Sequence, residues 1–234
     1  MNLIVSLTSH GKRLGLCIKT IFSILKQTVK VHIVLTLFKD DAKNIPTDLK
    51  LLIDNGIIEL IIADEDLGPH LKYFYTMLKY KNSTIITVDD DILYENDMIK
   101  KLLEFNKKFP NKIIANRCHY INGLNYNTWK KEIKEHTSNH NNFGTGVGGI
   151  LYPSNVFELN KDNINEIKQI KYADDIYLKI LEIRNNIEVV NRYNLDYKTL
   201  RNKEFEETAL YHKNLSNRNN EYIKKFENDF SKLK

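Results

Sequence analysis

Two hydrophobic periods alternate along the first 115 residues, and this alternation limits the fold more than any other feature of the chain. Short apolar runs, which fit buried strands, are followed by segments whose apolar residues recur at helical spacing, such as Leu14, Ile18 and Ile21. The pattern predicts strands at 3–7, 31–38, 57–63, 84–88 and 113–115, and helices at 12–27, 47–55, 71–80 and 97–108. This order predicts an α/β fold whose mainly parallel central sheet has helices on both faces.

The almost uninterrupted apolar run at 57–63 is typical of a strand that is buried on both faces of a sheet. Beyond residue 115 the pattern is less regular. We expect strands at 149–152 and 187–190, helices at 173–184 and 217–232, and a long polar loop at 119–143.

The length of 234 residues suits one well-buried domain, which we expect at 1–212, with halves at 1–115 and 116–212. The net charge of +5 is mild, so we expect no nucleic-acid partner. Six basic and three acidic residues at 213–234 make this stretch a basic tail. Its aromatic stripe and lysines predict either a helix that lies on an anionic membrane or one that packs on the domain.

The cysteines and the first residues bear on the compartment. Cys17 and Cys118 are too few for a disulfide framework or a cysteine-rich zinc site, which favours a reducing environment. The stretch at 1–7 lacks the basic and long apolar regions of a signal peptide, and no run is long and apolar enough to span a membrane. We therefore expect a cytoplasmic protein.

Three consecutive carboxylates, Asp89, Asp90 and Asp91, follow the buried strand at 84–88 and give the strongest chemical signal. Such side chains repel one another unless water or a cation surrounds them. Carboxylate oxygens are the ligands that Mg²⁺ and Mn²⁺ prefer, commonly together with the phosphates of a substrate. The alternative is a solvated turn that caps the next helix. Because ligands bind at the carboxyl ends of parallel strands, the position favours a ligand site.

Two other segments should reach the same edge of the sheet. Asp64 follows the strand at 57–63, and Lys72 is expected in the first turn of the next helix, where an anionic ligand would offset its poor match to the helix dipole. Thr8 and Arg13 follow the first strand. A ligand that carries phosphates would explain why these segments converge. Taken one at a time, each segment also has a simpler explanation: Lys72 as an exposed surface lysine, and Thr8 as a helix cap.

The glycine-rich run at 144–149 formally matches the dinucleotide-binding pattern G-x-G-x-x-G. That pattern should follow a strand and open a helix, and here a polar segment precedes it and a strand follows. We therefore predict a turn at Gly148 and Gly149 where the backbone approaches a sugar or acceptor.

The order of these features resembles the GT-A glycosyltransferases, in particular the family-2-like bacterial enzymes that use nucleotide-sugar donors. The matching segments are 5–9, 64, 89–91, 150–153 and 173–177. The resemblance implies that Asp91 binds the metal and that Asp89 contacts the metal or the donor ribose, with Asp90 beside the donor. It also implies that Asp64 contacts the nucleobase of the donor and that Thr8 and Arg13 lie in the loop that binds the nucleotide.

Asp174 and Asp175 lie where a helix should begin, and the helix dipole alone would account for them. The resemblance implies more: Asp175 as the catalytic base, and Asp174 as the residue that orients it or the acceptor. Some members of the family use a late histidine as a further metal ligand, and His212 lies at a comparable point. A solvated or packing role for His212 remains an equal alternative.

The resemblance thus implies a transferase that depends on Mn²⁺ or Mg²⁺ and moves a sugar from a nucleoside diphosphate sugar, with UDP favoured. The acceptor would be a hydroxyl of a surface glycan or of a lipid-linked glycan. A candidate base favours inversion. Two alternatives stay open: a sugar-1-phosphate nucleotidyltransferase, and an inactive module that binds glycans or nucleotides. No motif in 119–143 identifies the acceptor.

Overall fold

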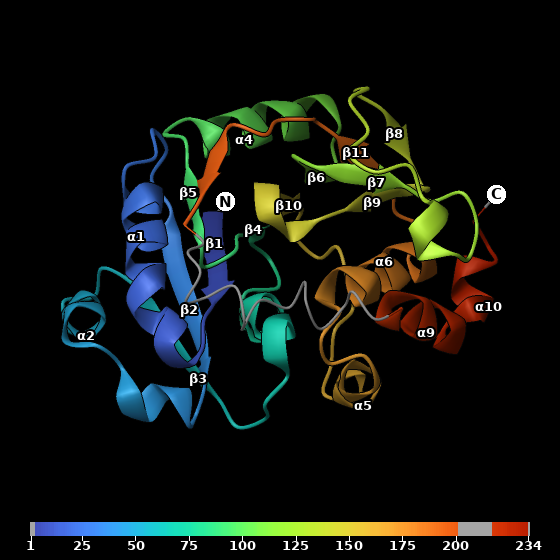
Figure 1. Ribbon diagram of the computed structural model, residues 1–234. Coiled ribbons are helices and arrows are strands. Elements are labelled where there is room, and N and C mark those ends of the chain that lie inside the picture. The colour runs from blue at the N-terminus through green and yellow to red at the C-terminus, as the bar shows by residue number, and fades with distance from the viewer. Residues whose placement is uncertain (1–2, 201–216, 234) are drawn as a thin grey trace.

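The computed structural model describes residues 3–200 and 217–233, which build a mixed sheet of eight strands in the order β3-β2-β1-β4-β10-β6-β11-β8 (Figure 1). Their bounds are β1 Leu3–Thr8, β2 His32–Phe38, β3 Glu59–Ala63, β4 Thr84–Thr87, β6 Ile113–Ala115, β8 Ser138–Asn139, β10 Ile150–Tyr152 and β11 Val189–Asn191. The first four strands in the sheet order are parallel, whereas β10 is antiparallel to both of its neighbours. The expected α/β fold with a mainly parallel sheet is confirmed.

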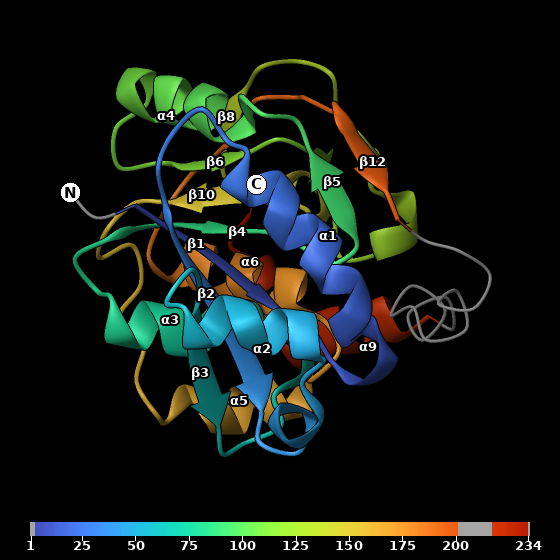
Figure 2. The same ribbon diagram turned by 90° about the vertical axis from the view of Figure 1, so that its left-hand side faces the viewer.

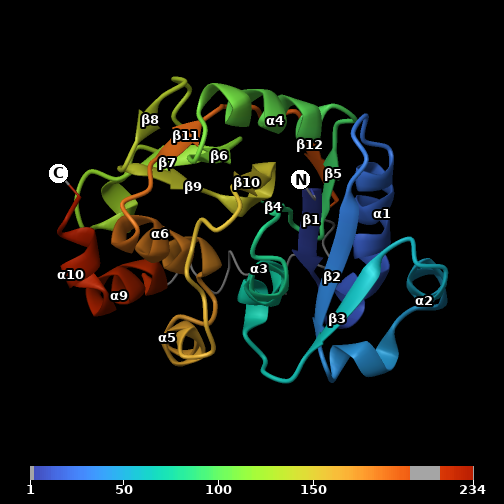
Figure 3. The same cartoon turned by 180° about the vertical axis from the view of Figure 1, so that it is seen from behind.

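Helices cover both faces of this sheet, as Figures 1 and 2 show. One buried cluster joins the sheet to α1 (Leu14–Leu25), α2 (Thr47–Asp54) and α4 (Met98–Lys108). The other joins it to α3 (Phe74–Lys79), α5 (Asn163–Gln169) and α6 (Asp174–Arg184). Seen from behind in Figure 3, α3 lies between the sheet and α5 and α6.

The segment before α3 differs from the prediction. Gly68–Lys72 forms a short 3-10 helix, η3, and α3 begins only at Phe74. Pro69 at the start of η3 fixes its own φ and suits a first turn. Lys72 is therefore not in the first turn of α3, and the expectation that a helix dipole disfavours it there is wrong.

The strand predicted to be buried on both faces is at the edge of the sheet instead. β3 pairs only with β2 within the described sheet, and the side chain of Ile62 is 56% exposed. An apolar run therefore did not mean full burial here: α3 contacts β3, and Leu60 and Ile61 are partly buried, but Ile62 stays exposed at the edge of the sheet.

The segment expected as a loop at 119–143 holds short strands. β7 (Cys118–Tyr120) pairs antiparallel with β9 (Asn142–Gly144), and the short helix η4 (Tyr126–Thr128) lies between them. A further pair, β5 (Ile92–Tyr94) with β12 (Tyr197–Thr199), follows the acidic turn. Hydrophobic periodicity predicted none of these short strands, although it predicted β6, which is equally short.

Two helices, α9 (Arg218–Lys225) and α10 (Glu227–Phe230), form the described part of the predicted basic tail. They pack against α6 and not away from the domain (Figure 1). The side chains of Tyr222, Phe226 and Phe230 are all buried in the same cluster as α6. The aromatic stripe is thus covered, which removes the apolar surface that the expected membrane contact required. Among the described residues, no helix is long and apolar enough to cross a membrane.

Candidate functional site

A cavity of about 550 Å³ opens where the carboxyl ends of β1 and β4 meet the beginning of α6. Most of the predicted site residues line it, and they come from both halves of the chain: Thr8, Arg13, Lys72, Asp89, Asp90, Asp91, Asp174 and Asp175. The structure therefore brings together side chains that are far apart in the sequence, as the convergence of strand ends predicted.

The segment between β1 and α1 holds the acidic turn after β4. The Ser9 hydroxyl donates a hydrogen bond to Oδ2 of Asp90 at 2.6 Å, and Nε of Arg13 donates to the same oxygen at 3.1 Å. Nη2 of Arg13 also lies 3.1 Å from Oδ2 of Asp91. Burial would lower the pKa of Arg13, but the hydrogen bond and charge of Asp90 raise it above its usual value. Arg13, expected to face a nucleotide, thus also neutralises two carboxylates.

The ammonium of Lys72 lies between two carboxylates from different elements. Its Nζ is 3.0 Å from Oδ1 of Asp89 and 2.6 Å from Oδ2 of Asp174, and the residue is 6% exposed. Burial by itself would lower the pKa of Lys72, but the charges of Asp174 and Asp89 raise it well above its ordinary value. Lys72 therefore stays charged and joins the acidic turn to the start of α6.

Asp174 and Asp175 are neighbours in the chain, but their environments shift their pKa values in opposite directions. Burial raises the pKa of Asp175 to about 8, and the charge of Asp174 adds to this effect. For Asp174 burial acts in the same direction, but the charge of Lys72 outweighs it and lowers the pKa. The backbone N–H of Gly146 donates to Oδ1 of Asp175 at 3.2 Å. Asp174 is thus a stable anion, whereas Asp175 can exchange a proton near neutral pH.

The sequence pointed to the glycine-rich run at 144–149 but not to Gly146 within it. A Cβ built on Gly146 would lie 2.7 Å from Nζ of Lys72 and 3.1 Å from Oδ1 of Asp89. The missing side chain thus leaves the space in which the charged groups of the cavity meet.

Three predicted residues do not line the cavity, and one cannot be placed. Asp64 is exposed beyond the end of β3, and Asp66 reaches the cavity instead. The two glycines have backbone roles: Gly149 has a φ of 87°, and a Cβ on Gly148 would approach that of Asn116 to 3.0 Å. His212 lies outside the described residues.

The other half of the cavity was not predicted from the sequence. It is lined by aromatic side chains and by groups that donate hydrogen bonds: Arg117, His119, Tyr126, Phe143, Tyr172 and Asn219. Burial lowers the pKa of His119 to about 4, with Arg117 adding to the effect, so the imidazole is neutral at pH 7. Three of the six, His119, Tyr126 and Phe143, lie in the segment expected as a loop, which carries no motif.

The donor chemistry of the acidic turn fits a hard divalent cation. Seven aspartates line the cavity against four Lys and Arg side chains, Arg13, Lys72, Arg117 and Lys171, which leaves an excess of acidic groups. Within residues 3–200 and 217–233, no three His, Cys, Asp or Glu side chains are placed to hold a metal ion by themselves. A Mg²⁺ ion commonly takes only one or two protein carboxylates and completes its shell with water and substrate phosphates. Asp89 and Asp91 would suffice for such a site.

Comparison with known proteins shows the fold but no family. No protein-family model matches the chain, and no curated protein matches it. Among solved structures it is similar to S. aureus TarS 1–349 in complex with UDP, at 12% identity and a TM-score of 0.52 over 82% of this chain and 58% of that one. The complex of TarS 1–349 with UDP-GlcNAc gives 13% identity and a TM-score of 0.55, over 89% and 61%. The fold is GT-A-like, as the resemblance implied, and the chain spans about three-fifths of those structures.

Proposed function

We propose that this protein is a glycosyltransferase that moves a sugar from a nucleoside diphosphate sugar to a hydroxyl group. The observation that carries the proposal is the meeting of the acidic turn after β4 with Asp174 and Asp175 of α6 in one cavity of a GT-A-like fold. A UDP-sugar is the favoured donor, because similar structures are complexes of TarS with UDP and UDP-GlcNAc.

Asp175 would act as the general base. Its raised pKa of about 8 suits a group that must take a proton near neutral pH. The acceptor oxygen forms a bond to the anomeric carbon, while the bond from that carbon to the diphosphate oxygen breaks and its electron pair leaves with the diphosphate. Asp175 receives the hydroxyl proton. One displacement of this kind inverts the configuration at the anomeric carbon.

Lys72 would stabilise the charge that develops on the leaving diphosphate. Its ammonium lines the cavity and is fixed by Asp89 and Asp174, so it needs little reorganisation during the reaction. Arg13 also lines the cavity, and its charge persists beside Asp90 and Asp91. Both cations would favour a donor that carries phosphates.

A bound Mg²⁺ or Mn²⁺ would offset the negative charge of the leaving diphosphate, and Asp89 and Asp91 would hold it. Asp91→Asn should therefore abolish turnover and the Mn²⁺-dependent part of nucleotide binding while the fold persists. Isothermal titration of UDP with and without Mn²⁺ measures this, with the exposed Asp54→Asn as control. Full activity and unchanged Mn²⁺ dependence in Asp91→Asn would remove the metal from the proposal.

The half of the cavity beyond Asp175 would receive the acceptor. Aromatic rings such as Tyr126 and Phe143 suit the apolar faces of sugars, and the neutral His119 and Asn219 can bond to hydroxyl groups. These features support a glycan acceptor, either a surface glycan or a lipid-linked one.

The experiment that tests the function is a thermal-shift panel of UDP, GDP and CDP with and without Mn²⁺, followed by assays of the best nucleotide's sugar donors. We expect stabilisation by one nucleoside diphosphate and release of that diphosphate during turnover. Release of pyrophosphate from a nucleoside triphosphate would indicate a nucleotidyltransferase instead. Binding without turnover of any donor would leave only a binding module.

A further inference from the structure

Tyr94 lies between the acidic turn after β4 and the glycine turn at 144–149. It is 4% exposed and lies at the end of β5, five residues after Asp89. The backbone N–H of Asp89 donates a hydrogen bond to the Tyr94 hydroxyl at 3.0 Å, and the hydroxyl donates to the carbonyl of Val147 at 3.3 Å. One phenol group thus connects the acidic turn to the glycine turn 53 residues away.

The position of Tyr94 is itself fixed by α1. The hydroxyl of Ser23 accepts a hydrogen bond from the backbone N–H of Tyr94 at 3.2 Å, and Thr20 Oγ1 donates to the carbonyl of Asp90 at 2.9 Å. Both hydroxyls belong to buried residues of one helix. α1 therefore holds both the acidic turn, through Asp90, and β5, through Tyr94. These two contacts fix the position of the Tyr94 ring relative to the acidic turn.

The glycine turn in turn places a group next to Asp175. Gly146 and Val147 belong to the same short helix, η5 (Gly146–Gly148), and the N–H of Gly146 donates to the Asp175 carboxylate. A displaced η5 would also change the space around Lys72 and Asp89 that the missing side chain of Gly146 provides. The hydroxyl of Tyr94 is thus a second connection between Asp89 and the start of α6, in addition to the ion pairs of Lys72.

We infer that Tyr94 is a positioning residue. It sets the distance between the acidic turn after β4 and Asp175, the proposed base, without touching either substrate. The inference rests on the proposed function for its kinetic part. Its structural part, that the hydroxyl holds η5 against the acidic turn, can be tested independently of turnover.

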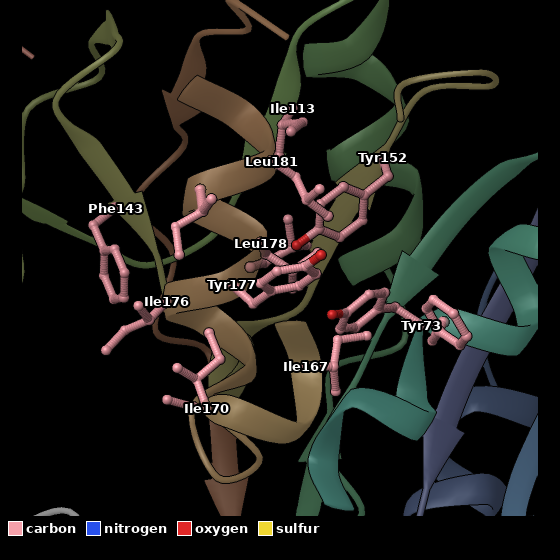
Figure 4. Close-up of a cluster of buried hydrophobic side chains, with 14 of the residues drawn as sticks. Tyr73, Ile113, Phe143, Tyr152, Ile167, Ile170, Ile176, Tyr177, Leu178 and Leu181 are labelled. Carbon is pink, nitrogen blue, oxygen red and sulfur yellow. The ribbon is translucent and has the colours of Figure 1, made fainter. Parts of the chain in front are cut away.

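Tyr152 offers a matched control from the other buried cluster. It is 1% exposed, and its hydroxyl has no hydrogen-bond partner. Figure 4 shows Tyr152 with Tyr73 and Tyr177, their hydroxyl groups turned toward one another. Tyr94→Phe and Tyr152→Phe therefore remove the same atom from similarly buried rings, but only the first change breaks the connection between the two turns.

The experiment measures both variants by hydrogen exchange and by steady-state kinetics with the preferred donor. Tyr94→Phe should exchange faster in the peptides that cover 88–94 and 144–149, and its kcat should fall about tenfold with KM for the donor within about twofold, as expected for two lost hydrogen bonds. Tyr152→Phe should match the wild type in both measurements.

Unchanged exchange in Tyr94→Phe, or an unchanged kcat in an active enzyme, would overturn the inference. A wild-type protein that turns over no sugar nucleotide would instead overturn the proposed function, and the exchange rates would still decide whether Tyr94 holds the two turns together.

Discussion

The ammonium of Lys72 lies 2.6 Å from Oδ2 of Asp174, a residue 102 positions later in the chain. Both side chains are almost completely buried, so this ion pair is shielded from water. Nζ of Lys72 also contacts Asp89, and a single cation therefore connects the end of β4 to the beginning of α6. The ion pair of Lys72 and Asp174 therefore stabilises the fold, and both residues also line the cavity.

Lys72→Gln should destabilise the fold and remove activity. Because the variant leaves the carboxylates of Asp89 and Asp174 buried without their cation, we expect the free energy of unfolding at pH 7 to fall by about 3 to 5 kcal/mol. Urea denaturation measures this change. Lys50→Gln, which breaks an exposed pair with Asp54, should change it by less than about 1 kcal/mol. Equal stability of the two variants would contradict a structural role for the buried pair.

The pH dependence of catalysis should follow Asp175. The base is active only as the carboxylate, and burial together with Asp174 raises its pKa to about 8. We therefore expect kcat/KM to rise about tenfold per pH unit from pH 6 and to level off above about pH 8. Initial rates at saturating metal across that range measure the profile. A rate that is constant between about pH 6 and pH 9 would exclude Asp175 as the base.

The same carboxyl group should influence stability in the opposite direction. Because its folded pKa lies above the usual value of 3.8, the protonated form stabilises the fold at low pH, and this contribution is lost as the pH rises to about 8. Asp175→Asn mimics the protonated form. Its stability relative to the wild type should increase between about pH 4 and pH 8, as thermal denaturation in EDTA can measure. A difference that does not change with pH would contradict the raised pKa.

Gly146→Ala should impair the site far more than it changes the fold. Its methyl group would lie 2.7 Å from Nζ of Lys72, which the two carboxylates hold in place, so the ion pairs must move. We expect kcat to fall at least about tenfold. Gly15→Ala is the control, since a methyl group there meets no atom within 4 Å and should stabilise α1 by about 0.5 to 1 kcal/mol. Wild-type kinetics in Gly146→Ala would show that the close approach is unimportant.

The sequence by itself determined the class of fold and one edge of the site. Hydrophobic periodicity depends only on near neighbours, and it located β1, β2, β4 and α1 to within a few residues. The acidic turn after β4 could be recognised because consecutive carboxylates after a buried strand need water or a cation around them. The other site segments could be placed beside it because parallel strands end at the same edge of a sheet.

Tertiary structure decided which of those residues meet. Asp64 and Asp66 both follow β3 and are both exposed, yet only Asp66 lines the cavity. The aromatic stripe of α9 and α10 suited either a membrane surface or packing on the domain, and in the structure it packs in the same buried cluster as α6. Tyr94 carried no signal, because a phenol gains its role only from the two backbone groups that the fold brings to its hydroxyl. Local patterns fix local structure, whereas ion pairs and hydrogen bonds across 50 or 100 residues depend on how the elements pack.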